Sequence, residues 1–157
     1  MKLKKLIAAM LAPVILLAGC GTDKPIADVP PTEIVNAVLA EVPITSAIEK
    51  SKSDIHDFYS DIDVSQVESA AFVICASGAY PDELAVMKCT DSAAADAVKA
   101  AFEKRLASQT ELFSTYTPDE MYKLETAKIY TSGNYAIFLA VSDNDRAKEI
   151  VDGKLTV

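Results

Sequence analysis

Apolar residues recur at helical spacing where the globular part of the chain begins. This stripe predicts a helix that starts near Thr32 and ends before Pro43, because the residue that precedes a proline disfavours helical backbone. A second helical or irregular stretch is expected over residues 44–59. The apolar positions of the first stripe are Ile34, Val35, Val38 and Leu39.

Further along, the pattern changes to near-continuous apolar runs of strand length. Two such runs, at 70–76 and 83–89, predict a pair of strands. Gly78 and Pro81 lie between them and are typical of a turn. The two runs therefore predict a β-hairpin.

Helical patterns follow each predicted hairpin. A long helix is expected from residue 92 to about 109, and a second hairpin at 127–131 and 135–141 precedes a final helix at 144–151. The buried stripe of the long helix comprises Ala94, Val98, Phe102 and Leu106. The sequence thus predicts a single α+β domain over residues 32–157, a four-stranded antiparallel sheet of two hairpins with helices packed mainly on one face.

The first twenty residues have the layout of a lipoprotein signal peptide. Three lysines precede an apolar run from Leu6 to Ala18, which is too short to cross a bilayer as a helix. The run ends in Leu17-Ala18-Gly19-Cys20, which resembles a bacterial lipobox, the site where a cysteine receives a diacylglyceryl group before cleavage. An ordinary cleaved signal peptide, or an apolar first helix, is the alternative. We expect a signal peptide over 1–19 and a lipidated Cys20.

A lipidated Cys20 would hold the domain on the extracytoplasmic face of the cell membrane. Two acyl chains on one residue give durable attachment, whereas one alone would be marginal. Residues 20–31, with three prolines, predict a flexible tether. Loss of the three lysines of the signal peptide would take the formal net charge from −8 to −11. A chain this acidic is not expected to bind nucleic acid or anionic headgroups through its surface.

Two cysteines, Cys75 and Cys89, would remain after cleavage. A disulfide is one interpretation, because such bonds form outside the cytoplasm. Folding the hairpin about Ala79 and Tyr80, however, offsets the two cysteines by about 13 Å along the strands, beyond disulfide reach. Two buried thiols are the favoured interpretation.

The most distinctive segment of the chain is Gly78-Ala79-Tyr80-Pro81-Asp82-Glu83-Leu84. Together with Arg105, Tyr116-Thr117-Pro118 and Gly133-Asn134-Tyr135, it resembles an uncharacterised family of Gram-positive bacterial lipoproteins, domain of unknown function 4358 (DUF4358). The resemblance covers about residues 34–151. It implies a surface-exposed lipoprotein with a small α+β domain, and it supplies no activity, cofactor or catalytic residue.

The turn in this segment has two interpretations. In the first, Asp82 and Glu83 are solvated acids at the sheet edge beside an ordinary turn. In the second, the turn is an interaction tip in which Tyr80 is an exposed aromatic anchor. Arg105, at the border of the apolar stripe of the long helix, either pairs with Glu83 or Asp82 or is a solvated charge.

Catalytic and metal-binding patterns are incomplete in this sequence. His56 is the only histidine; it lies among aspartates without zinc-ligand spacing, so no metal and no cofactor are predicted. A thiol dyad of His56 with Cys75 or Cys89 is disfavoured because both cysteines lie in apolar strands. Glycine-rich phosphate loops and nucleophile elbows are missing as well.

The sequence therefore favours a non-catalytic binding or interaction module. Its expected partners are membrane lipid, through acylated Cys20, and an envelope protein or peptide. The alternative is a cell-envelope hydrolase that uses Asp82 and Glu83, or Cys75. Adjacent strand residues point to opposite faces, which places those two acids poorly as an acid/base pair.

Overall fold

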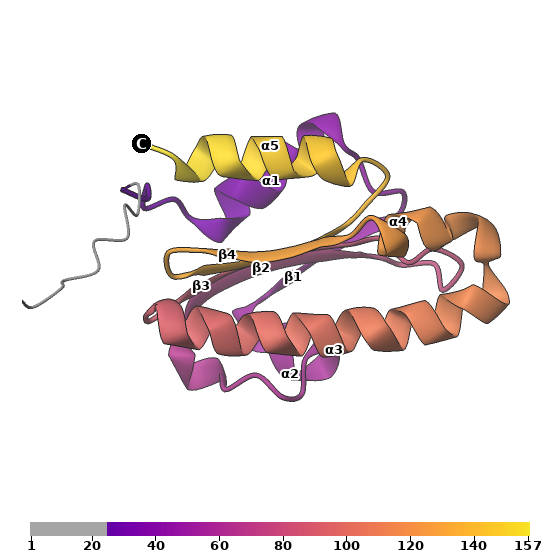
Figure 1. Ribbon diagram of the computed structural model, residues 1–157, viewed down its shortest axis with the longest axis horizontal. Helices are drawn as coiled ribbons and strands as arrows, with labels where there is room; N and C mark the ends of the chain where they lie inside the picture. The colour runs from indigo at the N-terminus through magenta and orange to yellow at the C-terminus, as the bar shows by residue number, and fades with distance from the viewer. Residues whose placement is uncertain (1–24) are drawn as a thin grey trace, which may run out of the picture.

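A computed structural model describes residues 25–157, in which a five-stranded antiparallel sheet lies between two layers of helices (Figure 1). The strand order is β1-β2-β3-β5-β4. The strands are β1 (Ala47–Ser51), β2 (Val67–Cys75), β3 (Glu83–Cys89), β4 (Lys128–Ser132) and β5 (Tyr135–Ala140). The helices are α1 (Pro31–Glu41), α2 (Ile55–Phe58), α3 (Ser92–Tyr116), α4 (Met121–Glu125) and α5 (Asn144–Leu155), with 3-10 turns at Lys52–Asp54, Val64–Gln66 and Pro118–Glu120. The predictions for residues 1–19, Cys20 and residues 21–24 lie outside the described residues.

The α+β class is confirmed, but the sheet has a fifth strand that the sequence pattern did not predict. Strand β1 falls within the stretch expected to be helical or irregular, and it pairs antiparallel with β2 from Ala47 opposite Cys75 to Ser51 opposite Ala71. Its five residues are mostly exposed and include Glu49 and Lys50, so they form no apolar run. An edge strand with charged side chains is protected against pairing with other chains.

Helices cover both faces of the sheet, so the prediction of one main helical face is wrong. Helices α1 and α5 pack on one face, and α3 with the short α2 packs on the other (Figure 1). Along β3, Leu84 and Val86 belong to the core on the α1 and α5 face, whereas Ala85 and Met87 belong to the core on the α3 face. A central strand that is buried on both faces requires a continuous apolar run, and that is the pattern β3 has.

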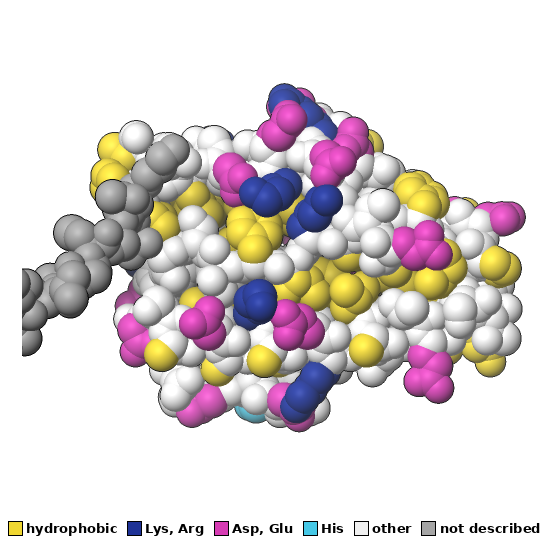
Figure 2. Space-filling model, viewed as in Figure 1, with side chains coloured by type: hydrophobic (Ala, Val, Ile, Leu, Met, Phe, Trp, Pro, Cys, Tyr) yellow, Lys and Arg dark blue, Asp and Glu magenta, His cyan; other side chains and the backbone are white. Residues whose placement is uncertain are grey.

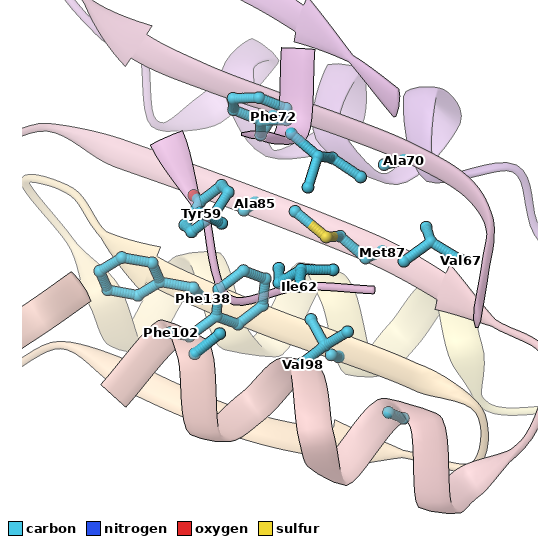
Figure 3. Packing of buried hydrophobic residues seen from close by; sticks show 14 of the residues in the cluster. Tyr59, Ile62, Val67, Ala70, Phe72, Ala85, Met87, Val98, Phe102 and Phe138 are labelled. Carbon is cyan, nitrogen blue, oxygen red and sulfur yellow. The ribbon is translucent and has the colours of Figure 1, made fainter. Parts of the chain in front are cut away.

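The core between the sheet and α3 is built around aromatic rings (Figure 3). Tyr59, which follows α2, packs edge-on against Phe72 of β2 and Phe102 of α3, with ring centroids 5.5 and 5.2 Å apart. Phe102 in turn lies 5.7 Å from Phe138 of β5. Helix α3 packs against β3, β4 and β5. Asp91 caps its first turn by accepting a hydrogen bond from the backbone N–H of Ala94 at 2.8 Å.

Helix α3 continues to Tyr116, two turns past the predicted end near Gln109. Beyond Gln109 only Phe113 is buried, and the end of the helix projects past the sheet (Figure 1). Because this end carries little apolar periodicity, the pattern of the sequence could not predict it. Among residues 25–157, no helix combines the length and the apolar composition needed to span a bilayer.

Residues 25–30, which the sequence predicts to be part of a flexible tether, are bound to the domain. We call this segment the N-terminal strap. Ile26 forms a β-bridge with Thr156. The other contacts are Ala27 N–H to Leu155 O (2.9 Å), Val29 N–H to the Tyr135 hydroxyl (3.0 Å), the Tyr135 hydroxyl to Val29 O (2.9 Å), and Lys88 Nζ to Asp28 Oδ1 (3.0 Å).

Candidate functional site

The turn between β2 and β3, the end of α3 and the short α4 meet at one end of the molecule (Figure 1). The N-terminal strap and the β4–β5 turn lie at the other end, where α3 begins (Figure 1). All the candidate residues of the sequence segment 78–84 are therefore far from the point where the chain enters the domain. We call the end that carries the β2–β3 turn the distal end.

Glu83 is buried rather than solvated, and this corrects one interpretation of the turn. It is the first residue of β3, its side chain is 1% exposed, and it faces α3. Arg105 of α3 donates from Nε to Glu83 Oε2 at 3.0 Å, and a terminal guanidinium nitrogen lies 3.0 Å from the same oxygen. The Tyr59 hydroxyl donates to Oε1 and Gln109 donates to Oε2 at 3.4 Å, so both carboxylate oxygens have partners. Of the arrangements left open for Arg105, the structure has the pair with Glu83.

This cluster joins three elements of the fold through one carboxylate. Burial, and then the negative charge of Glu83, raises the pKa of the Tyr59 hydroxyl well above its usual value. Tyr59 therefore stays protonated and remains a hydrogen-bond donor to Glu83 at neutral pH. A carboxylate that is held by a guanidinium, a phenol and an amide is a structural anchor.

Asp82, also predicted as a solvated acid, is buried as well, and its carboxylate faces Lys123 of α4. Its Oδ2 lies 2.7 Å from the ammonium of Lys123, which is 2.6 Å from Glu120 Oε2. Burial lowers the pKa of Lys123, but its hydrogen bonds to Asp82 and Glu120 outweigh that effect and raise the pKa above the usual value. Sequence reasoning missed Lys123, because it stands in a short connection whose apolar pattern is too brief to indicate which side chains are buried.

The side chain of Asn144 fixes the backbone at Lys123 through hydrogen bonds. Its side-chain amide donates to the backbone oxygen of Lys123 and to the hydroxyl of Thr126, each at 2.9 Å. Its side-chain oxygen accepts from the backbone N–H of Val141 at 2.9 Å. The sequence predicted Asn144 only as the start of the last helix. In the fold it ties α4 to the loop between β5 and α5.

Four exposed apolar or aromatic side chains surround these buried pairs. Tyr80 is 42% exposed, and the Lys123 ammonium lies 5.4 Å from its ring centroid and 5.8 Å from that of Tyr122. Tyr80 and Leu112 line a hollow of about 160 Å³, and Leu112 and Tyr116 line a second one of about 540 Å³. Shared hollows thus connect Tyr80, Leu112 and Tyr116, and Lys123 connects the rings of Tyr80 and Tyr122. We call Tyr80, Leu112, Tyr116 and Tyr122 the distal patch.

The two cysteines occupy opposite ends of the β2–β3 hairpin, and both are free. Cys89 is buried opposite Val67, and burial, followed by the nearby carboxylates, raises the pKa of its thiol to about 11. Cys75 is partly buried, and its sulfur donates to Thr45 O at 3.2 Å. Within the described part of the chain, no three His, Cys, Asp or Glu side chains gather closely enough to hold a metal ion.

A comparison with protein families finds a match to this chain. The model of the family described as Domain of unknown function (DUF4358) matches residues 41–142, which include the sheet, α3 and the distal patch. No curated protein and no solved structure matches the chain.

Proposed function

The chain belongs to the family Domain of unknown function (DUF4358), and we propose that within it the chain is a lipid-anchored, extracytoplasmic lipoprotein that acts as a non-catalytic binding module. The proposal has two parts, an anchor at Cys20 and a docking surface at the distal end. Each part rests on its own observation and has its own test.

The distal patch is the observation that carries the docking part. Tyrosine rings give large contact areas at a small entropic cost when their position is already fixed. Tyr80 and Tyr122 are held against Lys123, which is itself fixed by Asp82 and Glu120. The charged groups beneath the patch are paired with each other, and the patch itself consists of three tyrosines and a leucine. Such a surface is suited to docking a protein or peptide.

The anchor part rests on the lipobox of the sequence and on the geometry of the strap. The strap leaves the domain at the end opposite the distal patch (Figure 1). Residues 20–25, even fully extended, span only about 20 Å. A lipid on Cys20 would therefore keep the domain close to the membrane, with the distal patch directed away from it.

A cell-envelope hydrolase is the second candidate, and the smaller hollow is the observation that favours it. Cys75, Glu83 and Arg105 all contribute to its lining. Its volume of about 160 Å³ is below the range of about 300–1,000 Å³ that is typical of ligand sites. Both oxygens of Glu83 already accept hydrogen bonds from protein donors, so neither is free to contact a substrate. The docking role also explains the exposed side chains of the distal patch, which a hydrolase site in the smaller hollow does not explain.

Substituting Tyr80 tests the docking part. We expect Tyr80→Ala to reduce the crosslinked capture of envelope proteins several-fold, with an unchanged melting temperature, because the ring is exposed and supports no core. Ile48→Ala is the matched control, since Ile48 is 39% exposed on the edge strand β1, outside the distal patch. Equal capture by the wild type and Tyr80→Ala would remove the patch from consideration.

Removing the thiol tests the anchor part. We expect Cys20→Ser to leave the protein without a diacylglyceryl group and to shift it from the membrane fraction to the soluble fraction of cells. Mass spectrometry of the N-terminal peptide measures the modification directly. An unmodified Cys20 in the wild-type protein would show that the anchor does not exist.

A further inference from the structure

The distal end carries exposed acids and few available cations. Between Arg105 and Lys123 the sequence has no lysine or arginine, and these two cations are paired with Glu83 and Asp82. Glu111 and Asp119 are exposed, and neither forms an ion pair within residues 25–157. On the face seen in Figure 2, this end shows hydrophobic and acidic side chains and no dark blue lysine or arginine. The charge at this end is negative.

The acids border the apolar groups directly. Glu111 lines the same hollow of about 540 Å³ as Leu112 and Tyr116. Asp119 lies in the 3-10 turn that joins α3 to α4, three residues before Tyr122. A partner that covers the distal patch would therefore come within reach of both carboxylates.

We propose that the distal patch binds a protein segment that presents lysine or arginine beside an apolar side chain. This inference deepens the docking function proposed above and rests on it. The faces of tyrosine rings attract cations, and Lys123 already occupies such a position between Tyr80 and Tyr122. Leu112 supplies the apolar contact, while Glu111 and Asp119 determine the sign of the partner charge.

Two other occupants carry the wrong charge. A second copy of this chain, docked through the same patch about a twofold axis, would bring Glu111 and Asp119 against the same residues of its partner. An anionic lipid surface would be repelled in the same way. A cationic segment is the occupant that both the apolar and the acidic groups accept.

Two synthetic peptides that differ only in charge test the partner chemistry. The probe is a fluorescent peptide of alternating arginine and leucine, and its counterpart has glutamate in place of arginine. Fluorescence anisotropy with the full-length chain in nonionic detergent measures both affinities. We expect the arginine–leucine probe to bind at least roughly tenfold more tightly, and its binding to weaken as salt approaches about 1 M. Equal binding of the two peptides would overturn the proposal.

A matched pair of charge reversals locates the binding. Glu111→Lys and Glu49→Lys change the net charge equally, but Glu49 lies on β1, outside the patch. We expect Glu111→Lys to weaken the probe roughly five- to tenfold and Glu49→Lys to weaken it less than twofold. Equal weakening would show binding to overall charge and would overturn the proposal. The capture experiment with Tyr80→Ala does not use this probe, so a patch that docks a non-cationic partner would still be detected there.

Discussion

At the scale of single residues, the chain uses one carboxylate to join the sheet to its longest helix. Glu83 begins β3, and Arg105 reaches it from α3, more than twenty residues along the chain. Tyr59 adds a donor from a third segment. Because removal of one partner leaves the other charge buried and uncompensated, the cluster disfavours any packing of α3 that separates Arg105 from Glu83.

Arg105→Met should destabilise the protein by about 2–3 kcal/mol, because it leaves the buried Glu83 carboxylate without a cation. The loss is limited because the Arg105 side chain is partly exposed, so water can reach part of this site. Urea unfolding monitored by circular dichroism measures the loss. The control is Lys104→Met on the same helix, whose pair with Asp61 is largely exposed and whose loss should leave the unfolding midpoint unchanged. If the two variants unfold alike, the Glu83 cluster does not anchor α3.

At the scale of elements, the β4–β5 turn and the N-terminal strap depend on each other. Gly133 in this turn has a φ of +55°, which residues with a Cβ adopt only with strain. A Cβ at this position would also lie 2.7 Å from Cδ1 of Ile26 in the strap. Gly133 therefore allows both the turn and the close approach of the strap.

Gly133→Ala should lower the free energy of unfolding by about 1–2 kcal/mol and increase hydrogen exchange at the Ala27 and Val29 amides, because Ile26 must move. Gly153→Ala is the matched control. It lies in helix α5 with open space at its Cβ position, and we expect a gain of about 0.5 kcal/mol there. Unchanged exchange in Gly133→Ala would mean that the strap is not held by this contact.

At the scale of the whole molecule, two cores share one sheet, and each has a tyrosine hydroxyl in it or against it that must stay protonated. Tyr59 lies in the core on the α3 face, and Tyr130, which donates to Asp152 at 3.1 Å, packs against the core on the α5 face. Burial raises the pKa of both hydroxyls, and nearby carboxylates add to the effect. Cys89, with a thiol pKa of about 11, lies in the α3-side core.

Stability should therefore fall in alkaline solution. A folded-state pKa above the unfolded one gives stability that is complete below the unfolded pKa, about 9 for cysteine and 10 for tyrosine, and that is lost as the pH rises toward the folded value. We expect the urea midpoint to be constant up to about pH 8.5 and to decline above pH 9. Tyrosinate absorbance recorded in parallel should show the buried tyrosines ionising only as the protein unfolds. A midpoint that is constant to about pH 11 would contradict this assignment.

The hydrophobic pattern and the capping residues were sufficient to predict an element wherever its structure depends only on residues nearby in the chain. The strand over 83–89 has the predicted bounds, and the long helix starts after Asp91 as expected, because an apolar run and a capping side chain act within a few residues. Strand β1 could not be predicted in this way. Its side chains are mostly exposed and form no apolar run, and only its pairing with β2 makes it a strand.

By itself, the sequence determined that the chain is an α+β protein with two hairpins and a long helix, since each of these depends on neighbours along the chain. The tertiary structure decided which charges are used inside the fold and which groups remain at the surface. Asp82 and Glu83 are acidic neighbours in a turn by sequence, yet Lys123 and Arg105 arrive from distant segments and bury both of them. The distal patch likewise joins residues 80, 112, 116 and 122, which only the packing of α3 and α4 against the hairpin brings together.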